Sequence, residues 1–181
     1  TDADKFMELK GKLVKYEEIS DRMEYEIATF LNAVSTGEIS EITRLKIKAM
    51  YKIIGELESL GDSGETISRI LSRRNVHKKS FDADTIKKIN SMVNLVDVSY
   101  VVMIDNLKLA SEGRLEDITN AYAIEERINN LRNDFREEEI NSLEDKRKTY
   151  ETSVYFIDIL SELEKMGDFM INISQDLYKY K

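Results

Sequence analysis

Apolar residues recur at intervals of three and four along nearly the whole chain, which is the period of an amphipathic α-helix. Five such stretches are predicted, over about residues 3–35, 39–75, 82–112, 115–141 and 146–179. Gly37 and Gly113 stand where glycines commonly end helices, and either Asp82 or Asp84 suits the N-cap of the third helix. No segment alternates like a half-buried strand. The pattern predicts an all-α bundle of about five long helices, antiparallel where their connections are short.

The second and fifth predicted helices repeat one another at an offset of 106 residues. Glu56–Asp62 (ELESLGD) returns as Glu162–Asp168 (ELEKMGD), with five of seven positions identical. Seven apolar-seam positions stay in register, pairing Met50, Ile53, Leu57, Leu60, Gly64, Ile67 and Leu71 with Phe156, Ile159, Leu163, Met166, Met170, Ile173 and Leu177. We expect this seam to be buried, so that Leu57→Ala costs about 2–5 kcal/mol of stability.

The first and fourth predicted helices also align, at an offset of 108 residues, so a helix pair is duplicated. We therefore predict a single domain over 1–181, with one repeat over about 1–80 and a second over about 81–181. The third helix lies between the two pairs. Each repeated motif also carries a glycine inside its helix, Gly61 and Gly167. An interior glycine costs about 1 kcal/mol against alanine, which predicts close helix packing or room for a ligand at this point.

The composition narrows the functional classes. The 181 residues contain no Pro, no Cys and no Trp, and the net charge is −8. The absence of Pro fits long unbroken helices, and the absence of Cys excludes disulfides and thiolate metal sites. A nucleic-acid surface needs a basic footprint, which this acidic chain lacks. No apolar run approaches the roughly 20 residues of a membrane span, and the polar start is not a signal peptide.

Acidic residues four apart lie on one face of a helix. They are common in this chain, so only the pairs that recur in both repeats carry a signal. Glu58 and Asp62 recur as Glu164 and Asp168. Glu17 and Asp21 recur as Glu125 and Asn129, with one charge lost. If the first two helices fold back near residue 37, the two acidic pairs differ in register by about five residues, about 7 Å along the axis.

That register predicts two convergent clusters. The first contains Glu17, Asp21, Glu58 and Asp62, and the second contains Glu125, Asn129, Glu164 and Asp168. Converging carboxylates need a cation or must take up protons, and sites made of oxygen ligands suit Mg²⁺, Ca²⁺, Mn²⁺ or iron. The alternative is that these acids pair with Lys and Arg on adjacent helices.

The chain has two Leu-Glu-x-x-Gly-Asp motifs, and each lies late in a long helix. The helix before each motif carries an acidic pair or its remnant. In this arrangement the chain resembles the PhoU phosphate-signalling family. The family motif reads roughly L-E-R-I-G-D, and Leu57–Asp62 and Leu163–Asp168 match it. Three features depart from the family. Ser59 and Lys165 replace its arginine, Asn129 replaces an acidic residue, and the family has three helices per repeat, so the first helix of repeat one is absent here. The resemblance implies a PhoU-like fold and a divalent or trivalent metal held by the paired acids (iron, manganese, zinc or magnesium).

The resemblance also implies a function without catalysis, the regulation or sensing of phosphate transport. Because the first helix is absent and the chain starts without Met, it is most similar to the PhoU-like domains at the cytoplasmic C-terminus of bacterial Na⁺/phosphate cotransporters. The implied partner is the transmembrane transporter region of the same polypeptide, at the inner face of the cell membrane. A homodimer is a further option.

Two other readings remain open from the residues. One is a metal-free helical domain for interaction or dimerisation. The other is a ferritin-like di-metal enzyme, which needs Glu-x-x-His on its helices. The only histidine, His77, follows Arg74 at that spacing and lies in a basic linker, so we expect no enzyme. The basic residues from Arg69 to Lys79 compensate the end of a helix dipole, or they form a patch for phosphate or a partner.

Overall fold

The computed structural model describes residues 2–180, with side chains from residue 4 onward. Five helices make up this part of the chain: α1 (Asp2–Ser35), α2 (Glu41–Val76), α3 (Ala83–Ser111), α4 (Thr119–Glu144) and α5 (Tyr150–Lys179). No strand occurs within residues 2–180. The predicted all-α bundle of five long helices is thus confirmed. None of the five is both long and apolar enough to span a lipid bilayer.

Short polar side chains cap the first turns of α2, α3 and α5. The side chain of Ser40 accepts a hydrogen bond from the amide of Thr43 at the start of α2. Asp82 accepts one from the amide of Thr85 at 2.7 Å, so Asp82 and not Asp84 is the N-cap of α3. Gly113, with φ of +69°, follows the end of α3 as predicted, in the left-handed region that glycine adopts without strain.

The fourth and fifth helices begin later than the sequence pattern predicts. α4 starts at Thr119 instead of 115, because Leu115 and Ile118 are buried in the preceding loop and the Asp117 carboxylate accepts from the Thr119 amide. It ends at Glu144, three residues beyond the predicted end. α5 starts at residue 150 instead of 146, where Thr149 caps its first turn. An apolar residue that packs a loop against the core produces the same local sequence pattern as an apolar residue on a helix, so the pattern extended the predicted helix into the loop.

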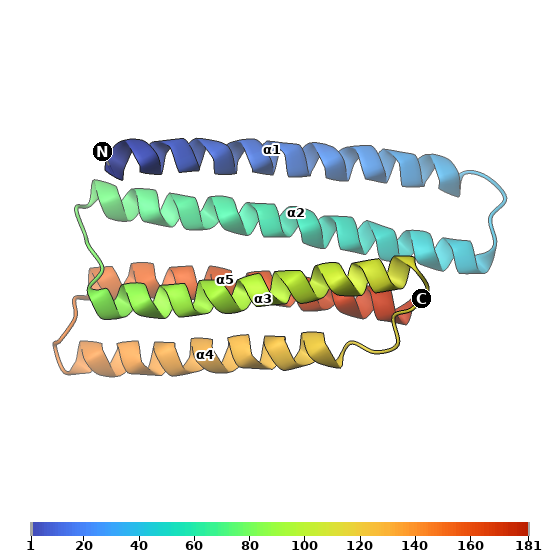
Figure 1. The fold of residues 1–181 in the computed structure, drawn as a ribbon. Helices are drawn as coiled ribbons and strands as arrows, with labels where there is room; N and C mark the ends of the chain where they lie inside the picture. The colour runs from blue at the N-terminus through green and yellow to red at the C-terminus, as the bar shows by residue number, and fades with distance from the viewer. Residues whose placement is uncertain (1, 181) are drawn as a thin grey trace.

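Figure 1 shows two central antiparallel helices, α2 and α5, flanked by α1 on one side and α4 on the other. α3 packs against both α4 and α5. In Figure 1 the pair α1–α2 and the pair α4–α5 lie on opposite sides of an axis between α2 and α5, and an approximate half-turn about it carries α1 onto α4 and α2 onto α5. In the described part of the chain, α1 packs only against α2, and no helix covers α1 and α2 as α3 covers α4 and α5.

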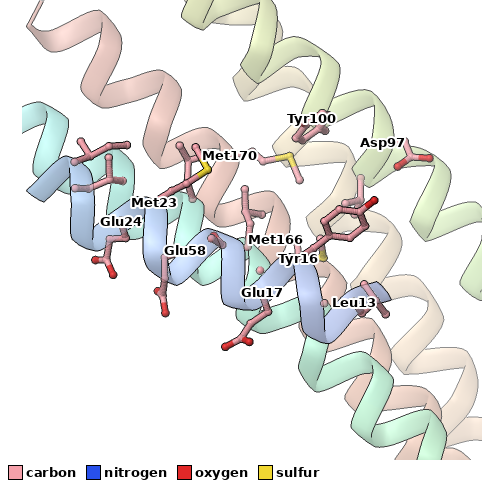
Figure 2. Close-up of a pocket in the computed structure, with 18 residues that line it drawn as sticks. Leu13, Tyr16, Glu17, Met23, Glu24, Glu58, Asp97, Tyr100, Met166 and Met170 are labelled. Atoms are coloured by element: carbon pink, nitrogen blue, oxygen red, sulfur yellow. The ribbon is translucent and has the colours of Figure 1, made fainter. Parts of the chain in front are cut away.

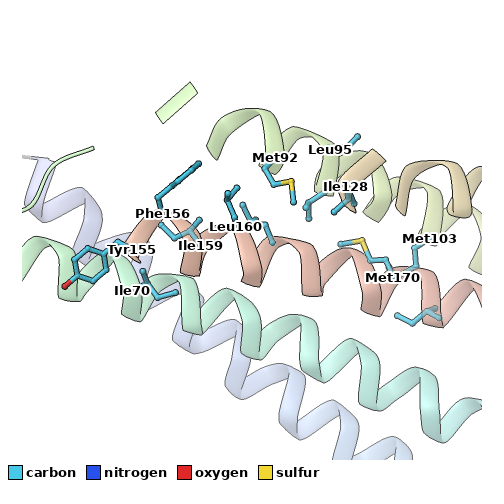
Figure 3. Packing of buried hydrophobic residues seen from close by; sticks show 13 residues of the cluster. Ile70, Met92, Leu95, Met103, Ile128, Tyr155, Phe156, Ile159, Leu160 and Met170 are labelled. Carbon is cyan, nitrogen blue, oxygen red and sulfur yellow. The ribbon is translucent and has the colours of Figure 1, made fainter. Parts of the chain in front are cut away.

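The hydrophobic core therefore lies mainly in the second repeat. Met92 and Met103 of α3, Ile128 of α4 and Phe156 of α5 are all buried within one cluster (Figure 3).

In contrast, most large apolar residues of α1 face solvent, with Tyr16 65% exposed and Met23 54% exposed, whereas Leu31 near its end is buried against α2. The prediction that the α2 seam is buried was wrong for Met50 and Leu57, which are exposed. The other apolar seam residues of α2 are half-buried against the core cluster: Ile53, Leu60, Ile67 and Leu71.

The exposure of Leu57 shows the difference in burial between the two repeats most directly. It is 37% exposed, whereas its equivalent Leu163 is only 4% exposed. The two leucines occupy the same position of the same motif, so the difference comes from the neighbouring helices. α3 covers the second repeat, and the first has no such helix within residues 2–180. The expected cost of 2–5 kcal/mol for Leu57→Ala is corrected accordingly, because that value applies to fully buried side chains.

Candidate metal centre

Three of the predicted acidic residues of the first repeat meet between α1 and α2. Glu17 and Asp21 come from α1 and Asp62 from α2, and one carboxylate oxygen of each lies within 4.8 Å of the others. Glu17 is half-buried, and the other two are exposed. Glu58, one turn before Asp62, lies beside this triad without belonging to it, and it accepts a hydrogen bond of 3.4 Å from the Ser59 hydroxyl.

The electrostatic field around this triad is negative. Partial burial raises the pKa of Glu17, and the carboxylates of Asp21, Glu65 and Asp62 raise it further. Burial also raises the pKa of Glu58, with smaller contributions from Asp62 and Glu24. Like charges brought this close disfavour the ionised form of each carboxyl group. A cation placed among them would reverse that effect.

No basic side chain within residues 4–180 forms an ion pair with Glu17, Asp21, Glu58 or Asp62. The nearest pair on α2 joins Glu65 to Arg69, at 3.3 Å. For the first repeat, the alternative in which Lys and Arg neutralise the acids is therefore not found in the described part of the chain.

The second repeat arranges its acids differently. Arg132 of α4 donates a hydrogen bond to Glu164 of α5 at 2.6 Å, as part of an ion pair. Asn129 donates one to Glu125 at 2.5 Å. Burial, then Glu164 and Glu125, raise the pKa of Asp168, while Arg132 lowers it. Among the described residues, Glu125, Glu164 and Asp168 do not form a close carboxylate triad like that of the first repeat.

Two exchanges between the repeats account for this difference. At the offset of 108 residues, Asp21 corresponds to Asn129 and Glu24 to Arg132. The first repeat therefore has an acid at both positions, where the second has an amide and a guanidinium. The guanidinium supplies the positive charge that a metal ion would otherwise supply. Reasoning from acidic pairs alone missed Glu24 and Arg132. A comparison of every α1 position with its α4 equivalent would have found them.

The motif glycines lie where the helices of each pair approach closely. A Cβ atom on Gly167 would stand 2.9 Å from Cδ1 and 3.3 Å from Cγ2 of the buried Ile128. On Gly61 it would stand 3.4 Å from the Ser20 hydroxyl oxygen. Ser20 and Ile128 are equivalent residues of the two repeats. Of the two reasons predicted for these glycines, packing too close for a side chain is observed at Gly167, whereas at Gly61 an added Cβ would make an ordinary contact.

We expect Gly167→Ala to destabilise the protein by about 1–3 kcal/mol, because the new methyl group overpacks the contact with Ile128. Gly61→Ala meets only an ordinary contact, so the better helix propensity of alanine should stabilise the fold by up to about 1 kcal/mol. Urea denaturation of the two variants measures both effects. Equal changes in the free energy of unfolding for Gly61→Ala and Gly167→Ala would contradict the tighter packing at Gly167.

The basic segment at the end of α2 makes local contacts. The guanidinium of Arg74 lies 4.7 Å from the ring centroid of Phe81, and Lys79 forms an ion pair with Glu151. Nδ1 of His77 is 2.6 Å from the hydroxyl of Tyr155. These contacts tie the α2–α3 connection to its neighbours and favour a structural role for the segment.

Comparison of the chain with protein-family models, with curated proteins and with solved structures found no match.

Proposed function

We propose that the chain is a PhoU-like regulatory domain in phosphate transport, and that its first repeat binds a metal cation without catalysing a reaction. The observation that carries the proposal is the triad of Glu17, Asp21 and Asp62. It lies beside the glycine-containing motif that the chain repeats, at the close approach of α1 and α2. The resemblance of both motifs to those of the PhoU family supplies the link to phosphate.

The donor set decides which cations suit the triad. It offers carboxylate oxygens only, with no histidine or cysteine. Oxygen ligands favour Mg²⁺, Mn²⁺ or iron, whereas Zn²⁺ favours nitrogen and sulfur ligands in structural sites. We propose Mn²⁺ or iron first, Mg²⁺ next and Zn²⁺ last, and that Arg132 lets the second repeat do without a metal.

In this proposal the domain acts on the transmembrane region of a sodium-dependent phosphate transporter, on the same polypeptide, at the cytoplasmic face of a bacterial membrane. A change in cation occupancy alters the fit between α1 and α2, and through it the surface presented to the transporter. The second candidate is a metal-free interaction domain. The exposed apolar face of α1, with Tyr16 and Met23, favours it.

We expect the wild-type protein to bind about one Mn²⁺ or Fe²⁺ per chain, and Asp21→Asn/Asp62→Asn to lose it. Removing two of three charged ligands weakens any binding that depends on converging carboxylates. Isothermal titration with each metal alone, followed by metal analysis of the desalted protein, measures the loss. The matched control is Asp168→Asn in the second repeat, which should retain the metal of the first.

Retention of metal by the double variant would show that the triad is not the site. Loss of metal in Asp168→Asn as well would show that the second repeat also binds, despite Arg132. No binding by the wild-type protein would leave the metal-free interaction domain.

The link to phosphate has a separate test. In the native host, uptake of radiolabelled phosphate should change in cells whose chromosomal copy carries Asp21→Asn/Asp62→Asn, relative to cells carrying Asp168→Asn. Unchanged uptake in both phosphate-rich and phosphate-poor media would contradict a role in phosphate transport, whatever the metal content.

A further inference from the structure

Two cavities beside α2 differ in their chemistry. One is an open and largely apolar groove between α1 and α3, with Leu57 on its α2 side. Figure 2 shows Tyr16 and Met23 of α1 facing Tyr100 and Met170 across this groove. The other, which we call the basic cavity, has a volume of about 500 Å³ and lies between the start of α1 and the end of α2. Only polar and charged residues line it: Lys10, Thr66, Arg69, Ser72 and Arg73.

The lining of the basic cavity carries three positive charges and no carboxylate, in a chain whose net charge is −8. Arg69 pairs with Glu65 at 3.3 Å. Arg73 and the half-buried Lys10 form no ion pair with any residue in the range 4–180. Neither arginine takes part in the contacts that tie the α2–α3 connection to its neighbours. Two of the three cations therefore lack a counter-charge that a bound anion would supply.

The hydrogen bonds of the cavity leave one hydroxyl group free to donate. Nη2 of Arg69 donates to the Thr66 hydroxyl at 2.8 Å. A threonine in a helix can donate to a carbonyl one turn earlier, but the Thr66 hydroxyl donates to no acceptor among residues 4–180. Ser72, in contrast, donates to the Ser68 carbonyl at 2.8 Å. Thr66 therefore keeps an O–H donor beside the Arg69 guanidinium, where it can bind an anion oxygen.

The dipoles of the two helices do not decide the sign of the field in this cavity. α1 begins beside the end of α2 (Figure 1), so the positive end of one dipole lies next to the negative end of the other. Each effect is also confined to about one helical turn. The three charged side chains therefore dominate, and their field attracts anions.

The second repeat does not keep this set of residues. At the offsets that relate the repeats, Arg69 corresponds to Gln175 and Lys10 corresponds to Ile118. Ile118 is buried in the loop before α4, where it contacts other apolar residues. The fold that both repeats share therefore does not require these cations. A ligand specific to the first repeat gives a reason for them.

We propose that the basic cavity binds a phosphate group through Lys10, Arg69 and Arg73. The Thr66 hydroxyl is a further donor to it. A guanidinium binds phosphate oxygens through two parallel N–H groups, and an ammonium adds a compact charge. The phosphate group has two possible sources, a soluble phosphate or diphosphate and the headgroup of an anionic phospholipid. The proposal goes beyond the regulatory function above, and it requires no metal at the carboxylate triad.

The test uses the whole protein, freed of metal by chelation and desalting. Isothermal titration with inorganic phosphate and with pyrophosphate tests the soluble source, and sedimentation with vesicles of phosphatidylglycerol or of phosphatidylcholine tests the headgroup. The variant is Arg69→Gln/Arg73→Gln, because both positions are exposed and glutamine is a good helix former. The matched control is Arg44→Gln/Lys48→Gln, which removes the same charge from exposed positions near the other end of α2. Circular dichroism verifies that both variants fold.

The wild-type protein should bind pyrophosphate saturably and more tightly than inorganic phosphate, because more negative charge then meets the three cations. Such binding assigns the cavity to soluble phosphates. Binding to phosphatidylglycerol vesicles alone, without binding to phosphatidylcholine, assigns it to the lipid headgroup. In either case Arg69→Gln/Arg73→Gln should weaken binding at least about tenfold, because it removes charge-assisted hydrogen bonds. The control should change the affinity less than about twofold.

No binding of any of these ligands by the wild-type protein would overturn the proposal. Equal weakening in the variant and the control would also overturn it, since net charge alone would then explain the effect. Binding that appears only after Mn²⁺ is added, and that Asp21→Asn/Asp62→Asn removes, would show that a metal and not the basic cavity holds the phosphate. Because the titrations contain no metal, a failure here is distinct from a failure of the metal proposal.

Discussion

Leu163→Ala should destabilise the protein by about 2–5 kcal/mol, whereas Leu57→Ala should cost less than about 1 kcal/mol. The two leucines hold the same place in the repeated motif, and the same three carbon atoms are removed in each variant. Leu163 is 4% exposed and packs in the main core cluster, so its truncation leaves a cavity. Leu57 is 37% exposed and lies at the open groove, where water fills the space that is vacated.

Urea denaturation of both variants, at one protein concentration and without added partner, measures the difference. Equal slopes against urea would show that both variants unfold in the same transition as the wild type. A similar large cost for both would contradict the open groove and would mean that Leu57 is covered in solution. Repeating the Leu57→Ala measurement over a range of protein concentrations would then identify a self-associated state.

The helices themselves could be predicted from the sequence, because the period of three and four is regular over long stretches. The duplication was also predictable, since Glu56–Asp62 and Glu162–Asp168 match in letter and register. The meeting of Glu17 with Asp62 followed from the rise per residue and the position of the turn near residue 37. These inferences use only distances along a helix, which the backbone fixes.

The burial of each apolar face could not be predicted in the same way. Periodicity shows which side of α1 is apolar, and it gives Tyr16 and Ile124 equivalent positions. It does not show whether another helix covers that side. Coverage depends on which elements are present in the fold, and the second repeat has α3 where the first has none within residues 2–180. The exposed apolar face of α1 is thus a property of the tertiary arrangement.

The ion pairs between helices could not be predicted from the local sequence pattern either. Glu164 was predicted as a ligand from its place in the motif, and the structure pairs it with Arg132 from the neighbouring helix. Glu139 belongs to the acidic run 137–139, a composition typical of a solvated helix end, and yet it is only 1% exposed. Its place in the core is explained by partners that come from other elements.

Lys148→Met should destabilise the protein by about 3–5 kcal/mol, because it leaves the Glu139 carboxylate buried without its counter-ion. The ammonium of Lys148 donates to Glu139 at 2.8 Å and to the hydroxyl of Thr85 at 2.8 Å. The Ser153 hydroxyl donates to the other carboxylate oxygen at 2.5 Å. These contacts join the start of α3, the end of α4 and the start of α5. Their loss should therefore lower the free energy of global unfolding, which urea denaturation measures.

Lys12→Met is the matched control, since Lys12 pairs with Glu8 at 2.7 Å with both side chains more than half exposed. Removing an exposed pair typically costs less than about 1 kcal/mol. Adding Glu139→Gln to Lys148→Met should recover a large part of the loss, because the amide removes the buried charge and its oxygen still accepts from Ser153. If Lys148→Met costs no more than Lys12→Met, Glu139 has access to water in solution and the buried pair does not hold the three helices together. If the second substitution recovers nothing, the loss comes from the contact of the Lys148 ammonium with the Phe156 ring, whose centroid lies 5.6 Å from the nitrogen, and not from the unpaired charge.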